Sequence, residues 1–66
     1  MIVFDRLWET MKEKGFSSYT LREEHDFHSD TIKNLRNNRN VSMNTLSKLC
    51  EVLDCRLEDI AEYVKD

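Results

Sequence analysis

The 66-residue chain contains no proline, a single glycine at Gly15, and only two cysteines, Cys50 and Cys55. Tight β-hairpin turns and phosphate-cradling loops depend on glycine and proline, so their scarcity excludes a β-rich fold and a P-loop. Two cysteines do not make the disulfide framework of a small secreted domain. The composition therefore predicts a helical protein in a reducing, cytoplasmic setting.

The chain also has no long apolar run, and its first residues, MIVFDRLW, lack the basic segment that begins a signal peptide. Hydrophobic residues make up 39% and charged residues 35%, which is typical of a soluble domain and not of a membrane span or a disordered tail. We expect one domain over residues 1–66. A chain of this length buries about 60% of its unfolded surface, so a homodimer would add stability.

Apolar spacing predicts where the helices begin. Phe4, Leu7, Trp8 and Met11 form one helical stripe, which Gly15 can close in a left-handed conformation. Four further apolar pairs are each five residues apart, the spacing of a hydrophobic staple across a helix N-terminus. These pairs are Phe16 with Leu21, Phe27 with Ile32, Val41 with Leu46, and Cys55 with Ile60.

The residue after the first member of each pair is the expected N-cap. These residues are Ser17, His28, Ser42 and Arg56, with Ser29 as an alternative to His28. The sequence thus predicts a compact, all-α, five-helix domain, with helices over residues 4–14, 18–25, 29–37, 43–53 and 57–64.

The connection between the second and third helices is three residues long, Asp26-Phe27-His28, which is the length of a helix-turn-helix corner. Such a corner favours glycine at the position of Asp26. Aspartate and asparagine tolerate positive φ better than other non-glycine residues, so Asp26, and Asn38 after the third helix, suit the same backbone.

The third helix has one apolar edge and one polar edge. Ile32 and Leu35 define the side expected to be buried, and the opposite side carries Asp30, Lys33, Asn34 and Asn37. The Asn34 amide matches adenine in the major groove, while Lys33 can reach guanine and Asp30 can accept from cytosine. The alternative for these polar residues is a solvated helix face, and for Asp30 a first-turn carboxylate that favours the helix N-terminus.

Charge is divided unevenly along the chain. The net charge is −3, which argues against general affinity for polyanions or anionic membranes. Residues 29–42 nevertheless carry a local +2, because Lys33, Arg36 and Arg39 outnumber Asp30. Residues 43–66 carry a local −3, from three basic against six acidic residues. Any nucleic-acid binding is therefore expected at the third helix and the loop after it.

From about Leu7 to Ile60 the chain resembles the Cro and phage-repressor (XRE-like) type of helix-turn-helix domain, in particular its short single-domain bacterial regulators. The resemblance rests on LREEHDFHSDTIKNL at residues 21–35, Asn37-Asn38-Arg39, and VSMNTL at residues 41–46. It implies a lambda-repressor-like fold whose third helix is the recognition helix. It places Ser29, Asp30, Lys33 and Asn34 at base-facing positions. It places Ser18, Asn37, Arg39 and Asn40 where family members touch phosphates.

The predicted function is sequence-specific binding of double-stranded DNA by a small transcriptional regulator, a repressor in preference to an activator. The alternative is a protein-interaction module with the same fold, such as an antitoxin or accessory factor, that works through its acidic C-terminal half. No enzyme activity, cofactor, metal or small-molecule ligand is expected, because the histidines and cysteines match no familiar zinc pattern and no nucleophile has a neighbouring base.

Apolar residues near the two chain ends have no place on a helical stripe. Ile2 and Val3 precede the first predicted helix, so they either form an extended segment or contact a second subunit. Tyr63 and Val64, which the pattern assigns to the last helix, are further candidates for a dimer surface.

Overall fold

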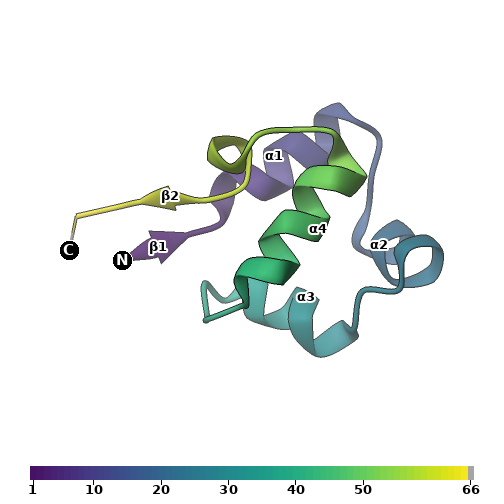
Figure 1. Cartoon of the computed structure of the whole chain (residues 1–66), viewed down its shortest axis with the longest axis horizontal. Helices are drawn as coiled ribbons and strands as arrows, with labels where there is room; N and C mark the ends of the chain where they lie inside the picture. The colour runs from purple at the N-terminus through teal and green to yellow at the C-terminus, as the bar shows by residue number, and fades with distance from the viewer. Residues whose placement is uncertain (66) are drawn as a thin grey trace.

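The computed structural model describes residues 1–65, in which four α-helices, one 3₁₀ turn and a two-stranded ribbon follow one another (Figure 1). The elements are β1 (Ile2–Val3), α1 (Asp5–Glu13), α2 (Ser18–His25), α3 (Ser29–Arg36), α4 (Met43–Leu53), η1 (Leu57–Asp59) and β2 (Glu62–Tyr63). None of the helices in this part of the chain combines the length and apolarity needed to cross a bilayer.

One hydrophobic core joins the helices. Its fully buried side chains come from all four of them and from the residue that follows η1: Leu7, Leu21, Leu35, Leu49, Leu53 and Ile60. Phe4 and Met11 of the predicted first stripe are also buried, and Trp8 is half-buried against the same cluster. The apolar pattern therefore identified the inner side of each helix correctly.

The predicted N-caps of α2, α3 and α4 are confirmed. The Oγ atoms of Ser17 and Ser42 accept from the N–H groups of Thr20 and Thr45, at 3.2 and 3.1 Å. His28 Nδ1 accepts from the Asp30 N–H at 3.2 Å, so His28 and not Ser29 caps α3. Each cap satisfies a backbone donor that has no partner within its own helix.

Residues in the left-handed conformation follow the helices. Gly15, Asp26 and Asn38 have positive φ, as predicted, and Asp54 after α4 has it too, which the sequence pattern did not indicate. The N–H after three of them bonds back across the helix end, from Phe16 to the Met11 carbonyl, Arg39 to Asn34, and Cys55 to Cys50, at 2.8, 2.8 and 3.1 Å. These bonds redirect the chain sharply between elements.

The prediction of a fifth helix over residues 57–64 is wrong. Arg56 begins a helical turn, as its spacing indicated, but η1 ends at Asp59. The Asp59 carbonyl accepts the Thr10 hydroxyl of α1 at 2.8 Å. The chain then extends so that Glu62 and Tyr63 pair with the N-terminal strand. Cross-strand pairing with a distant segment thus prevails over local helical spacing, because a single helical turn has little stability of its own.

The extended interpretation of Ile2 and Val3 is confirmed. They form β1, which pairs antiparallel with β2 in the register Ile2 with Tyr63 and Val3 with Glu62. Val3 is buried, whereas Ile2 and Tyr63 are exposed. The ribbon projects from the helices and carries both ends of the chain, on the left in Figure 1.

Candidate nucleic-acid interface

The helix-turn-helix corner has the predicted length and backbone. Asp26, with φ 58°, ends α2, and its three-residue connection leads directly into α3. The Phe27 N–H bonds to the Leu21 carbonyl at 3.0 Å, and the Phe27 side chain is buried. The corner is therefore fixed from inside the core, which sets the direction of α3.

The inner and outer edges of α3 lie where the sequence placed them. Ile32 and Leu35 are 6% and 0% exposed. Ser29, Asp30 and Lys33 are exposed, in line with Arg36 and Asn37 at the end of the helix. Asn34 is half-buried at the flank of this exposed edge, and its side chain makes no hydrogen bond within residues 1–65. Three of the four predicted base-facing residues thus form one open stripe, with Asn34 beside it.

Asp30 lies in the first turn of α3, where a carboxylate favours the positive end of the helix dipole. Its Oδ2 is 3.8 Å from Nδ1 of His28, and both side chains are largely exposed. An exposed pair of this kind contributes little to stability. Asp30 therefore remains available at the start of the exposed edge.

Arg36, one of the basic residues of segment 29–42, also lies at this surface. Its guanidinium lies 4.6 Å from the centroid of the Trp8 ring, and its Nη2 donates to Ser18 Oγ at 2.8 Å. The stacking of an arginine on tryptophan orients the planar donor group while leaving several N–H groups unused. Arg36 from α3 thereby meets Ser18, a predicted phosphate contact, at the N-terminus of α2.

The sequence indicated only part of the contact between Arg36 and Trp8. Arg36 follows Leu35 on the exposed side of α3, and Trp8 lies on the helical stripe of α1. Nothing in the spacing, however, indicates that α1 and α3 bring these two side chains together. The proximity is a product of tertiary packing.

The other predicted phosphate contacts lie on the loop after α3. Asn37 Nδ2 donates at 3.0 Å to the Lys33 carbonyl, which also accepts the Asn37 backbone N–H. The Arg39 backbone is fixed by its bond to the Asn34 carbonyl. Arg39 and Asn40 are exposed, and neither side chain has a partner within residues 1–65.

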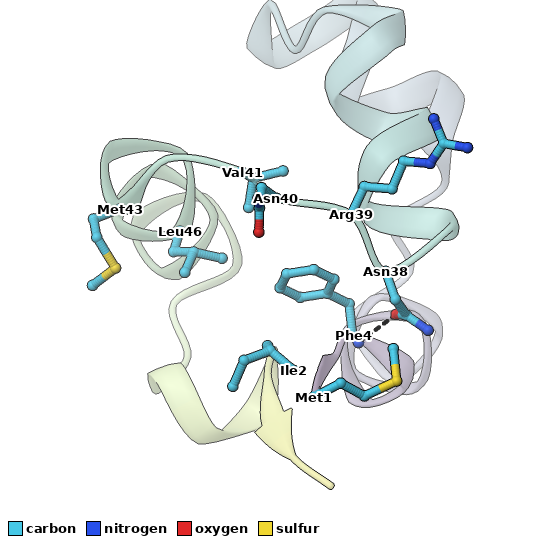
Figure 2. A pocket seen from close by; sticks show the side chains of 9 residues that line it. All are labelled: Met1, Ile2, Phe4, Asn38, Arg39, Asn40, Val41, Met43 and Leu46. Carbon is cyan, nitrogen blue, oxygen red and sulfur yellow. Dashed lines mark hydrogen bonds between the residues drawn. The ribbon is translucent and has the colours of Figure 1, made fainter. Parts of the chain in front are cut away.

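Behind this loop lies an open hollow of about 450 Å³, mostly apolar, between β1 and the start of α4 (Figure 2). The Phe4 ring points into it, and the Arg39 side chain is directed away from it. Its lining residues are Met1, Ile2, Phe4, Asn38, Arg39, Asn40, Val41, Met43 and Leu46. Asn38, Asn40 and Val41 of the loop line this hollow, and the Arg39 side chain extends outward from it.

The acidic 3₁₀ turn η1, which contains Glu58 and Asp59, lies away from α3. Figure 1 shows η1 and α3 on opposite sides of α4. Around η1, Arg56 Nε is 2.8 Å from a Glu58 carboxylate oxygen, and Arg6 of α1 is 3.7 Å from Glu62. Near α3, Lys48 Nζ lies 4.5 Å from the centroid of the Phe27 ring and adds positive charge beside the corner. The acidic residues Glu58 and Asp59 therefore lie away from α3, whereas Glu23, Glu24 and Asp26 lie on α2 and at the corner.

The two cysteines are free and half-buried at the end of α4. Burial raises the pKa of the Cys55 thiol, and the nearby Cys50 and Asp59 act in the same direction. Within residues 1–65, no three histidine, cysteine, aspartate or glutamate side chains are grouped so that they could hold a metal ion.

Comparison with known proteins agrees with this geometry. The family model for the Cro/C1-type HTH DNA-binding domain matches residues 6–66. Among solved structures, the chain is similar to the crystal structure of the transcriptional regulator VanUg, Form II. The TM-score is 0.89 and the sequence identity 29%, over 98% of this chain and 87% of the other. No curated protein matches the chain.

Proposed function

Because the chain belongs to the family of Cro/C1-type helix-turn-helix DNA-binding domains, we propose that it is a small cytoplasmic transcriptional repressor that binds a specific duplex site as a homodimer. The similarity to a solved transcriptional regulator supports the regulatory role. The observation that carries the proposal is the burial of Ile32 and Leu35, which turns the polar edge of α3 outward between basic residues.

In this proposal α3 enters the major groove and α2 lies across the backbone, as in other helix-turn-helix proteins. Lys33 and Asn34 read purine edges, since a lysine ammonium donates to guanine and an asparagine amide pairs with adenine. Ser29 and Asp30 face the bases at the N-terminal end of α3. Asp30 discriminates against sequences that do not offer a donor such as the cytosine amino group.

Phosphate contacts come from both sides of α3. Ser18 and Arg36 lie together at the N-terminus of α2, where helix N–H groups also favour an anion. Asn37, Arg39 and Asn40 lie at the other end, on the loop. Two groups of contacts that flank the recognition helix would fix its orientation on the duplex.

The homodimer follows from the number of contacts that one such domain can make. A single recognition helix contacts few bases, and two copies on half-sites about one helical turn apart multiply that specificity. Occupation of a promoter by such a dimer blocks transcription without any further domain. Repression is therefore the proposed outcome.

A titration of fluorescent duplex DNA with the full chain, at two salt concentrations, tests the proposal. Affinity should fall steeply with salt because phosphate contacts release counterions. Arg39→Ala should reduce the salt dependence, and Arg56→Ala, at the acidic end, should leave it unchanged. Absence of binding even at low salt would contradict the proposal and favour a protein-interaction role for the acidic half.

A further inference from the structure

The two cysteines of the chain lie at either end of one backbone turn, where α4 ends. The Cys55 N–H bonds to the Cys50 carbonyl at 3.1 Å. Inside this bond, Asp54, which has φ 49°, donates its N–H to the Glu51 carbonyl at 3.3 Å. Two such bonds around a left-handed residue form the Schellman motif, in which the side chains at the ends of the outer bond commonly touch. The backbone therefore brings the Cys50 and Cys55 side chains together.

The same outer bond closes α1, where it joins two ordinary apolar residues. The Phe16 N–H bonds to the Met11 carbonyl at 2.8 Å across Gly15, and both side chains pack in the core. At the end of α4 the equivalent positions hold the only two cysteines of the sequence. Any pair of hydrophobic residues makes the apolar contact of this motif, whereas two thiols can also form a covalent bond.

The two thiols are in contact with each other. Burial raises the pKa of the Cys55 thiol, and so do the charge of Cys50 and a hydrogen bond between the two side chains. Both cysteines are free, half-buried and packed against the core. A disulfide needs Cα atoms about 4.4–6.8 Å apart and Cβ vectors that point toward each other. Two residues that share a backbone hydrogen bond and a contact between their thiols meet both conditions without movement of a helix.

We propose that Cys50 and Cys55 are a reversible redox pair, which hydrogen peroxide converts into an intramolecular disulfide. In the first step a thiolate attacks one peroxide oxygen, the O–O bond breaks, and a sulfenic acid and hydroxide are formed. The second sulfur then attacks the sulfenic sulfur, the S–O bond breaks, and the departing hydroxide takes the thiol proton to become water. Two thiols and one peroxide thus give one disulfide and two waters. Each sulfur loses one electron, and the peroxide oxygens are reduced.

The two cysteines have different roles in this sequence of steps. Thiolate is the nucleophile toward peroxide, and the raised pKa of Cys55 leaves less of that side chain ionised, so Cys50 is oxidised first. Cys55 then attacks as an intramolecular nucleophile that is already in place. Without it, further oxidation would put a charged sulfinate among the apolar side chains around α4. The pair keeps oxidation at a step that a small thiol reverses.

The redox pair lies away from the candidate interface. α4 begins beside α3 and ends on the opposite side of the domain, near η1 (Figure 1). Lys14 Nζ donates to the Asp54 carbonyl at 3.4 Å, which places the end of α1 beside the pair. The ring that the disulfide closes spans residues 50–55 and includes no part of α3 or the loop after it. Formation of the disulfide therefore does not depend on the proposed function and can be measured without DNA.

Mass spectrometry of the full chain after treatment with hydrogen peroxide tests the proposal. Trypsin cleaves after Lys48 and Arg56, so both cysteines fall in one peptide, residues 49–56. Without reductant this peptide should lose two hydrogens, about 2 Da, and dithiothreitol should restore its mass. Circular dichroism should show unchanged helix content in the oxidised chain. Sulfinic acid in place of the disulfide, a disulfide only between two chains, or loss of helix on oxidation would overturn the proposal.

Cys55→Ser and Cys50→Ser are matched variants that test the two roles. Cys55→Ser should accumulate a sulfenic acid at Cys50, which dimedone traps, and should then proceed to the sulfinic acid. Cys50→Ser should react with peroxide several-fold more slowly. Equal rates in the two variants would contradict the assigned order. The wild-type measurement requires no substitution, so it decides whether the disulfide forms even where a serine variant does not fold.

Discussion

Asn38 Oδ1 accepts the backbone N–H of Phe4 at 2.8 Å, across 34 positions of sequence. Asn38 lies immediately after α3 and its cap, in a left-handed conformation, while Phe4 lies between β1 and α1. The Asn38 backbone therefore turns the chain after α3, and its side chain accepts the Phe4 N–H at the edge of the ribbon. The bond connects the loop that carries Arg39 and Asn40 to the N-terminal strand.

Replacement of Asn38 should therefore destabilise the protein in two separable ways. Asn38→Gly keeps the left-handed backbone but leaves the Phe4 N–H without its partner, at a cost of about 1–3 kcal/mol. Asn38→Ala should lose about 1 kcal/mol more, because alanine is strained at positive φ. Urea denaturation followed by circular dichroism measures both. Wild-type stability in Asn38→Gly would show that the bond contributes nothing.

Arg36→Ala should weaken DNA binding by a similar factor on all sequences. It should also make the fall of log affinity with log salt shallower, by about 1 in the slope, because one phosphate contact is lost. Arg36→Lys keeps the charge but cannot stack on Trp8 and bond Ser18 with the same planar geometry, so it should recover only part of the affinity.

The control for this substitution is Arg22→Ala, since Arg22 is also an exposed arginine but makes no bond within residues 1–65 to the α3 surface. Titrations on a preferred and a random duplex provide the comparison. A loss confined to the preferred duplex would assign Arg36 to base reading, contrary to its position beside Ser18.

The Cys55 thiol should react slowly with iodoacetamide at neutral pH. Burial is the main reason that its pKa is raised, so less of it is thiolate than in an ordinary cysteine. The measurement uses Cys50→Ser, in which that burial remains, and compares the folded chain with the same chain in urea. The pH profile of the folded protein should lie to higher pH. Equal rates in the two states would contradict the assignment.

Most of the fold follows from local rules visible in the sequence. Staples such as Phe16 with Leu21 and caps such as Ser42 act between residues a few positions apart, so their spacing specifies helix starts before any tertiary contact forms. The corner at Asp26 was predictable for the same reason. The polar edge of α3 then follows from the burial of Ile32 and Leu35.

Apart from the left-handed conformation of Asp54, the features that the sequence did not indicate depend on distant segments. The ribbon requires residue 2 to meet residue 63, and the stacking of Arg36 on Trp8 requires α1 to lie beside α3. The spacing of apolar residues after Arg56 favoured a helix. Such local spacing cannot show that Tyr63 pairs with a strand at the other end of the chain. The candidate site was therefore predictable along α3 and only partly predictable around it.

The central claim, that the polar edge of α3 reads bases, is tested most directly by Asn34→Ala on a selected preferred duplex and on a random one. The matched variant is Asn40→Ala, which removes an amide from the proposed phosphate contacts. Asn34→Ala should lose about 1–3 kcal/mol of binding free energy on the preferred duplex and almost none on the random one. Asn40→Ala should lose equally on both. An equal loss on both duplexes for Asn34→Ala, or no loss on either, would contradict base reading by this edge of α3.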